Sequence, residues 1–125
     1  MPLQFFGSPE QPLYEIKANL FKALAHPARI RILEILSASD EPTPVSEILT
    51  ETGIEPTLLS QHLSVLKRHQ VVRGRRVGNA VFYELAHPKI SELLVIARMF
   101  LADTLGARRD QLEALQTLPP IGPQL

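Results

Sequence analysis

The chain has 125 residues and a mass of 14.0 kDa, which suits one domain and leaves no room for two. Apolar residues make up 45% of it and charged residues 21%, which excludes a disordered or fibrous protein. It contains no cysteine, so disulfides, thiolate metal sites, thiol redox sensing and cysteine nucleophiles are excluded. No apolar run approaches the ~18–20 residues of a membrane span, and the first residues do not resemble an export signal. We therefore expect a soluble cytoplasmic domain that does not act at a membrane.

Proline residues divide the chain into segments. Four of them precede stretches with apolar residues at helical spacing, and proline is well tolerated where a helix begins. The pattern predicts four helices, which follow Pro12, Pro27, Pro44 and Pro56 and cover 13–25, 28–36, 45–52 and 57–69. Residues 1–11 and 118–125 are rich in proline, and we expect them to be flexible tails of one domain over 12–117. Phe5 and Phe6 in the first tail are expected to pack against the domain.

The periodicity then changes from helix to strand. Residues 71–77 and 80–85 are rich in β-branched and aromatic side chains, and Gly78-Asn79 between them is typical of a two-residue hairpin turn. Pairing across this turn places three pairs opposite each other, namely Arg73 and Glu84, Gly74 and Tyr83, and Arg76 and Val81.

A long helix is predicted after Pro88. At ~1.5 Å per residue it would reach about 40 Å, and Gly106 is the position at which it would bend or end early. Its apolar side chains follow one stripe, formed by Ile90, Leu93, Leu94, Ala97, Phe100, Leu101, Leu105, Leu112 and Leu115.

Charge is unevenly distributed although the chain is neutral overall. Residues 67–76 carry five basic and no acidic side chains, whereas 1–66 carry four basic and eight acidic ones. The remaining residues, 77–125, carry four basic and five acidic side chains. A positive segment that runs from the end of a helix into a hairpin is a suitable contact for a phosphate backbone.

Residues 57–69 are expected to form a helix whose outer surface is mostly polar. With Leu59, Leu63 and Leu66 turned inward, the residues left outside are, apart from Leu58, short polar or basic ones: Thr57, Leu58, Ser60, Gln61, Ser64, Lys67 and Arg68. Glutamine can pair with adenine through two hydrogen bonds in the major groove, and the basic residues would reach phosphates. His62 fits the core edge and a DNA contact equally well. Together with 45–51, joined through Thr52-Gly53-Ile54, this segment predicts a helix-turn-helix.

Three blocks of the chain resemble the ArsR/SmtB family of bacterial winged-helix repressors. They are FKALAHPARIRILEIL at 21–36, SQHLSVLKRHQVV at 60–72 and RRVGNAVFYEL at 75–85. The resemblance implies a mainly α fold with a β-hairpin wing, a recognition helix over 56–69 and a wing over 71–85. It also implies a homodimer through the first and last helices, with an interface of Leu13, Ile16, Leu20, Ile90, Leu93, Leu94, Ala97, Phe100 and Leu101. The wing would contact DNA through Arg73, Arg75, Arg76 and Asn79.

The chain departs from the family at its sensor sites. Many members bind metals through cysteines on the helix corresponding to 45–51, where this chain has Val45 and Ser46. Other members use Asp and His residues on the last helix, which here contains no histidine. We therefore predict no metal site and no cofactor. An atypical His/carboxylate metal site across the dimer, a small-molecule effector, a partner protein and protein concentration alone stay open as the inducing signal.

Four further residues differ from the family pattern or bear on metal binding. Glu55 stands where members commonly have Ser, and glutamate is a poor N-cap. His26 is expected to cap or pack at the start of its helix rather than to bind metal. His69 ends the recognition helix, where a cation suits the helix dipole. His87 is expected to lie in a loop beside Pro88.

The sequence thus predicts a transcriptional repressor and not an enzyme. No Gly-rich phosphate loop, HExxH or GxSxG motif is present, and Ser60-Gln61-His62 cannot form a triad because i and i+2 face apart on a helix. We expect a homodimer that binds a palindromic double-stranded DNA operator in the bacterial cytoplasm, on the nucleoid. The alternatives are a metal-responsive repressor and a winged-helix module that binds a partner protein.

Overall fold

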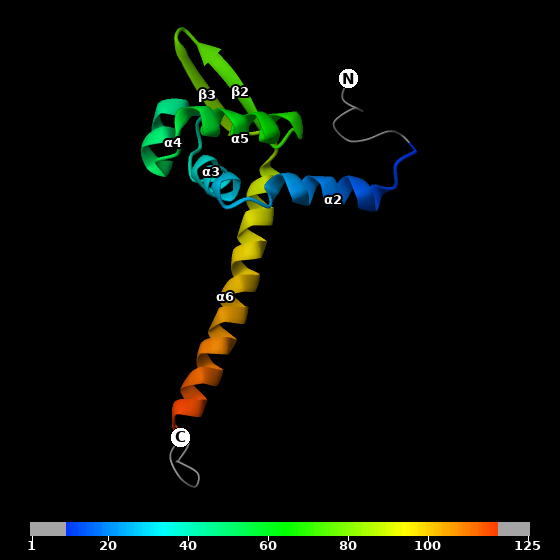
Figure 1. Ribbon diagram of the computed structural model, residues 1–125, viewed down its shortest axis with the longest axis vertical. Coiled ribbons are helices and arrows are strands. Elements are labelled where there is room, and N and C mark those ends of the chain that lie inside the picture. The colour runs from blue at the N-terminus through cyan, green and yellow to red at the C-terminus, as the bar shows by residue number, and fades with distance from the viewer. Residues whose placement is uncertain (1–9, 118–125) are drawn as a thin grey trace. The chain divides into compact units, whose positions relative to one another are not determined.

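A computed structural model describes residues 10–117 of the chain (Figure 1). The chain divides into two compact units, Met1–Ser91 and Glu92–Leu125. Most of the predicted tails, including Phe5 and Phe6, lies outside the described residues. The first unit holds the first four predicted helices, the hairpin and the start of the last predicted helix, in the predicted order.

Four helices of the first unit begin at the predicted prolines. α2 (Leu13–Leu24) follows Pro12 and α4 (Val45–Thr52) follows Pro44, while α3 (Pro27–Ser37) and α5 (Pro56–Arg68) have proline as their first residue. The first turn of a helix tolerates proline because its N–H groups have no intrahelical partner. Gly53 ends α4 in the left-handed conformation, at a φ of 68°, which glycine adopts without strain.

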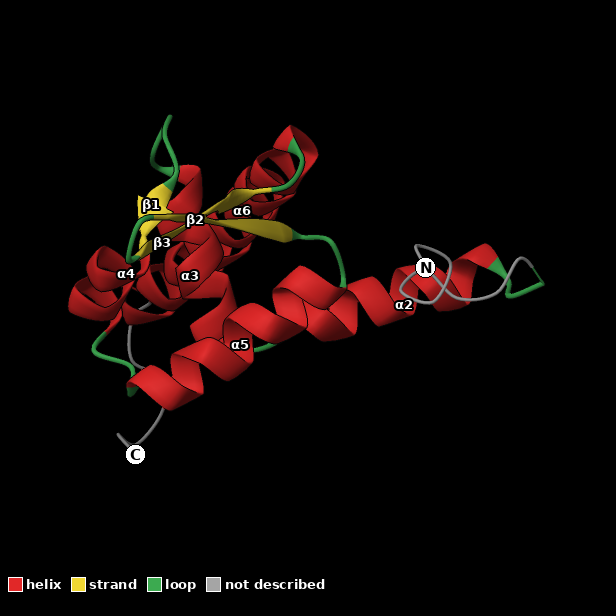
Figure 2. Ribbon diagram, turned by 90° about the horizontal axis from the view of Figure 1, so that it is seen from above, coloured by secondary structure: helices red, strands yellow, loops and turns green. Residues whose placement is uncertain are grey.

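The hairpin belongs to a small antiparallel sheet. β2 (Val72–Val77) pairs with β3 (Ala80–Leu85), and the three predicted pairings across the turn are confirmed. A third strand, β1 (Thr43–Pro44), pairs with the other side of β3, so the order is β1-β3-β2. β1 was not predicted, because two residues are too few to show the alternation of a strand. Figure 2 shows the strands in yellow beside α3 and α4.

The core of the first unit is built around α3, as its nearly continuous apolar pattern predicts. α3 packs against α4, α5 and β3, and it buries four aliphatic side chains. The other helices and the start of β2 complete the core, whose buried apolar side chains are Ala23, Leu24, Ile32, Leu33, Ile35, Leu36, Ile48, Leu59, Leu63, Leu66, Val71 and Val72. Because α5 supplies three of these residues, its axis is fixed by the core and its opposite face is left to solvent.

The last helix, α6 (Pro88–Thr117), has 30 residues and continues through Gly106, so of the two effects expected of this glycine, a bend or an early end, the early end is wrong. It begins in the first unit, where the hydroxyl of Ser91 forms a hydrogen bond with that of Ser37 in α3. In the second unit α6 exposes large apolar side chains, among them Ile96 at 63%, Met99 at 60% and Phe100 at 67%. Within residues 10–117, no helix has the length and hydropathy to span a membrane.

Candidate nucleic-acid interface

α5 begins with a capping hydrogen bond that its sequence did not suggest. A side-chain oxygen of Glu55 accepts a hydrogen bond from the backbone N–H of Leu58 at 3.0 Å. Hydrogen bonds from the N–H groups of Thr57 and Leu58 hold the pKa of Glu55 below its usual value. The expectation that Glu55 is a poor N-cap is therefore wrong here, because its carboxylate reaches one of the N–H groups that the first turn leaves without a partner.

The outer face of α5 is polar and open. Leu59, Leu63 and Leu66 face the core, as predicted. The side chains predicted to face DNA are exposed, with Leu58 at 45%, and they comprise Thr57, Leu58, Ser60, Gln61, Ser64, Lys67 and Arg68. Lys67 and Arg68 occupy the last turn, where positive charge also suits the helix dipole.

His62 does not belong to that outer face. Its residue is 5% exposed, and its Nδ1 accepts a hydrogen bond from Nε of Arg29 in α3 at 3.2 Å. The ring of His26 lies beside it, with 4.5 Å between the ring centroids. The prediction that His62 contacts DNA is therefore wrong, and the alternative, a place at the edge of the core, is correct. A side chain enclosed by α3 and α5 cannot reach a base.

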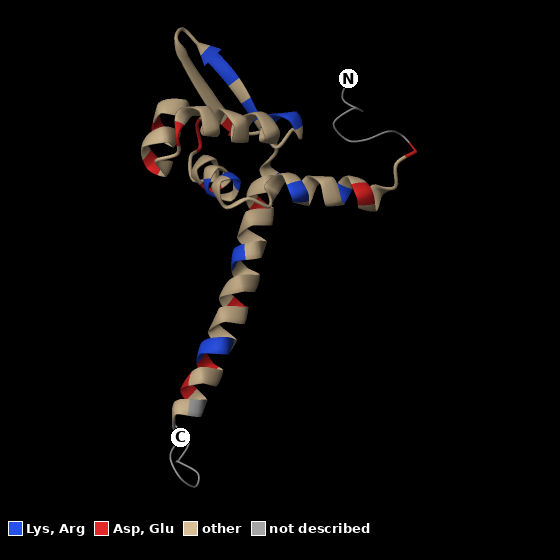
Figure 3. Ribbon diagram, viewed as in Figure 1, with Lys and Arg blue, Asp and Glu red and all other residues tan. Residues whose placement is uncertain are grey.

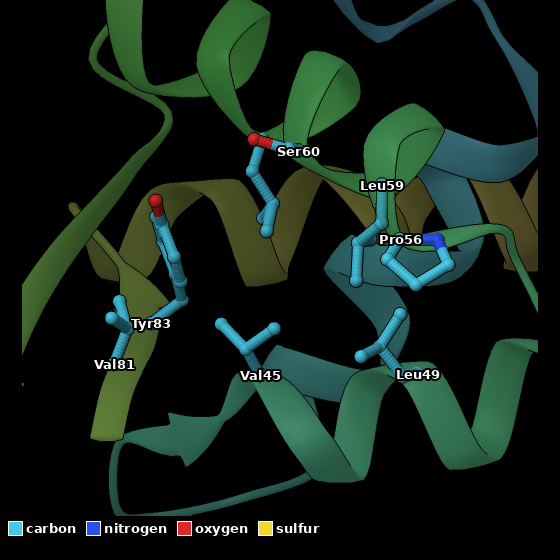
Figure 4. A pocket seen from close by; sticks show the side chains of 8 residues that line it. Val45, Leu49, Pro56, Leu59, Ser60, Val81 and Tyr83 are labelled. Atoms are coloured by element: carbon cyan, nitrogen blue, oxygen red, sulfur yellow. The ribbon is translucent and has the colours of Figure 1, made fainter. Parts of the chain in front are cut away.

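α4 and α5 form the helix-turn-helix. Residues 53–55 connect them, and the Thr52 hydroxyl accepts a hydrogen bond from the N–H of Ile54 at 3.2 Å, which orders the connection. A cavity of about 220 Å³ lies between α4, α5 and β3. Figure 4 shows the hydroxyl groups of Ser60 and Tyr83 on one side of it and the side chains of Val45 and Leu49 on the other. The wing strand β3 thus lies next to the helix-turn-helix.

The wing carries three arginines that differ in their surroundings. Arg75 and Arg76 are exposed, and among residues 10–117 neither has an acidic partner within ion-pair distance. Arg73 is held by Glu84 across the hairpin, with 2.7 Å between Nε and Oε1. Asn79 at the tip is exposed too. Figure 3 shows basic residues along β2 and at the end of α5, which places the positive segment 67–76 at one end of the recognition helix.

The remaining histidines have local structural roles. His26 Nδ1 accepts a hydrogen bond from the N–H of Ala28 at 3.1 Å and caps α3, so its predicted capping role is confirmed. His69 is the C-cap residue of α5, and its Nδ1 lies 3.0 Å from the carbonyl oxygen of Val65. His87 precedes α6 and accepts from the N–H of Lys89. The described part of the chain contains no cluster of three or more metal-ligating side chains.

The proposed dimer surfaces can be described on each helix separately. On α2, Leu13 is 64% exposed while Ile16 and Leu20 are half-buried. On α6, the predicted interface residues Ala97, Phe100 and Leu101 are exposed. Ile90, Leu93 and Leu94 are half-buried. Both helices thus present apolar side chains that a partner could cover.

Comparison with known proteins decides the family. Residues 24–75 match the model of the helix-turn-helix domain family. The uncharacterized HTH-type transcriptional regulator Rv0081 of Mycobacterium tuberculosis is 51% identical over 107 residues, which cover 85% of this chain and 92% of the relative. The repressor SmtB of the same species is 32% identical over 93 residues, which cover 74% of this chain and 67% of SmtB. The chain belongs to the ArsR/SmtB family. It is therefore a DNA-binding transcriptional regulator and not an enzyme.

Solved structures agree with this assignment. The crystal structure of Rv0081 superposes with a TM-score of 0.71 at 51% identity, covering 79% of this chain and 98% of that one. The homodimeric winged helix-turn-helix DNA-binding domain of Mb0332 from Mycobacterium bovis, solved by NMR, gives 0.68 at 28% identity, covering 78% and 93%. The winged helix-turn-helix fold predicted for this ArsR/SmtB member is confirmed.

Proposed function

We propose that this ArsR/SmtB member is a homodimeric repressor whose two recognition helices enter successive major grooves of a palindromic operator. The observation that carries the proposal is the open polar face of α5 beside the exposed arginines of β2. Short hydroxyl and amide side chains allow close approach to base edges, and Gln61 has the geometry for a two-hydrogen-bond contact to adenine. Two-fold symmetry would set the half-sites about one helical turn apart, at ~34–36 Å.

The contacts divide into two kinds. Thr57, Leu58, Ser60, Gln61 and Ser64 would read bases or nearby sugar-phosphate, because they lie on the exposed face of α5. Lys67, Arg68, Arg75 and Arg76 would neutralise phosphates. Arg73 would contribute less than these, because Glu84 already holds its guanidinium. Asn79 would approach the backbone at the wing tip.

Dimerisation through α2 and α6 is supported by the apolar side chains that each helix exposes. Exposed apolar patches of this kind mark interaction surfaces. The Mb0332 domain, a structural neighbour, is homodimeric, which supports a homodimer here. A double charge reversal, Arg75→Glu with Arg76→Glu, separates DNA binding from a protein-interaction function: DNA binding should be lost while the dimer persists in sedimentation.

The salt dependence of operator binding tests the docking. Selection from a random duplex library supplies the operator, and affinity is then measured at several salt concentrations. If three or four cations of each subunit neutralise phosphates, the dimer makes about 6–8 phosphate contacts. A plot of log K against log salt concentration should then have a slope near −5 to −7. A slope shallower than about −3 would contradict this docking. Calorimetric titration of the dimer with zinc and nickel tests the metal-responsive alternative.

A further inference from the structure

The recognition helix is connected to two other helices through a single arginine. Arg29 is the third residue of α3, and its Nε donates to His62 Nδ1 in α5 at 3.2 Å. Its Nη1 donates to the carbonyl oxygen of Ala23, in the last turn of α2, at 3.1 Å. Carbonyl groups at the end of a helix have no intrahelical partner, so this second bond satisfies one of them. One guanidinium therefore joins α2, α3 and α5.

The donor character of arginine determines the state of His62. A guanidinium has no acceptor and keeps its charge in proteins, so His62 Nδ1 must be unprotonated to accept its hydrogen bond. The proton of the neutral ring is then on Nε2. This nitrogen is buried and has no hydrogen-bond partner within the described residues. The geometry thus requires His62 to be neutral, with its proton on Nε2.

The surroundings of His62 oppose a second proton. Protonated, the ring would place an N–H donor against the Arg29 donor and a positive charge against the Arg29 charge. The other titratable group that acts on it is His26, whose ring lies beside it in the turn between α2 and α3. Burial, followed by the influence of His26 and Arg29, lowers the pKa of His62 below its usual value.

We propose that Arg29 and His62 are positioning residues for DNA binding, and that they hold α5 against α2 and α3 only while His62 is neutral with its proton on Nε2. Neither side chain touches DNA in this arrangement, because His62 is enclosed and Arg29 is turned toward Ala23 and His62. The pair acts on the exposed face of α5 by fixing the orientation of the helix that carries it. This inference rests on the proposed DNA-binding function of that face.

The tautomer is tested first, on the full-length wild-type protein without DNA. The 15N shifts of the two ring nitrogens distinguish the tautomers, and His62 is assigned by comparison with His62→Asn. We expect a single neutral form with Nδ1 unprotonated at neutral pH. A ring protonated on Nδ1, or a fast mixture of tautomers, would overturn the inference.

The positioning role is tested with paired variants. Arg29→Ala should increase hydrogen exchange of the α5 amides and lower affinity for a mixed-sequence duplex at low salt by about tenfold, since it leaves the His62 acceptor without its partner. Arg31→Ala is the matched control, because Arg31 is an exposed arginine of α3 that forms an ion pair with Glu34 in the same helix. Equal effects of the two variants on α5 exchange and DNA affinity would refute the role of Arg29.

Substitutions of His62 separate positioning from packing. His62→Phe keeps a ring in the core but removes the acceptor, and it should lose about as much affinity as Arg29→Ala. His62→Asn keeps an acceptor near the Nδ1 position and cannot titrate, so it should retain affinity within about threefold of wild type. If His62→Phe binds as well as wild type, the hydrogen bond does not position α5.

The pH profile supplies the readout that packing alone would not give. Affinity is measured from neutral pH down to the pH at which wild type begins to unfold, and over this range wild type should lose affinity relative to His62→Asn as His62 takes up its second proton. Parallel profiles of the two proteins would overturn the proposal. If wild type does not bind duplex DNA at all, the proposed function fails, while the tautomer and the α5 exchange still judge the Arg29–His62 pair.

Discussion

Neutralising Glu84 should strengthen DNA binding, although it removes the ion pair that the wing contains. The Nε–Oε1 distance between Arg73 and Glu84 is 2.7 Å, but the two side chains are 67% and 38% exposed. An ion pair that exposed to water contributes only about 0–1 kcal/mol to stability. Glu84→Gln should therefore leave the free energy of unfolding nearly unchanged while it frees the Arg73 guanidinium for a phosphate.

The size of the gain follows from counterion release. One further phosphate contact per subunit adds two per dimer, which should steepen the salt slope by about 1.8. At 0.15 M salt, near physiological ionic strength, such a contact is worth about fivefold in affinity, so the dimer should gain up to about 30-fold. The assay is fluorescence anisotropy on the selected operator at several salt concentrations.

A matched variant separates this effect from a change in net charge. Asp103→Asn also removes one negative charge, but Asp103 lies on α6, in the second unit, rather than on the wing. It should leave the slope unchanged. If Glu84→Gln leaves the slope as it is in wild type, or weakens binding, then Arg73 does not lie within reach of a phosphate and the docking of the wing is wrong.

Other substitutions should have distinct signatures. Gln61→Ala should lose about 1–3 kcal/mol of discrimination at one base pair, whereas Arg76→Ala should weaken binding to all sequences alike. Affinities for a set of operator variants check this, and a uniform loss for Gln61→Ala with a base-selective loss for Arg76→Ala would contradict it. Glu55→Ala should lower the thermal midpoint of unfolding. Because the pKa of Glu55 in the folded protein lies below its usual 4.5, its contribution to stability is present above pH 4.5 and disappears as the pH falls through the folded pKa. If the midpoints of wild type and variant differ equally at neutral and strongly acid pH, the cap does not stabilise α5. Gly74→Ala would place a Cβ 2.9 Å from Cε1 of Tyr83 and should cost about 1–3 kcal/mol in urea unfolding; an unchanged midpoint would mean that the Tyr83 ring moves freely aside.

Local signals made much of the fold predictable. The prolines gave the starts of the helices, and Gly78-Asn79 gave the turn from which the strand register follows. The outer face of α5 was predictable as well, because buried Leu59, Leu63 and Leu66 leave only one side of a helix for other residues. Each of these inferences uses residues within a few positions of one another.

The features that were missed depend on partners that no local pattern identifies. His62 is separated from Arg29 by 33 positions, so its burial is decided by tertiary packing and not by its place on the helix. Glu55 was judged by an average preference, but its side chain folds back onto the N–H of Leu58. β1 contributes two residues, too few to alternate, and it forms because β3 offers a free edge. Gly106 was expected to bend α6 or end it early, but α6 does not end there, because a single glycine costs only about 1 kcal/mol in a helix.

The strand order also has a consequence for the solubility of the protein. In the order β1-β3-β2, both outer strands expose backbone groups that could pair with a strand of another molecule. One edge has only two residues, the second of which is Pro44 and has no N–H to donate. The other edge carries Arg75 and Arg76, whose like charges repel a second copy of the same strand. The cations that we propose for DNA binding therefore also keep the wings of unbound molecules from joining into a continuous sheet.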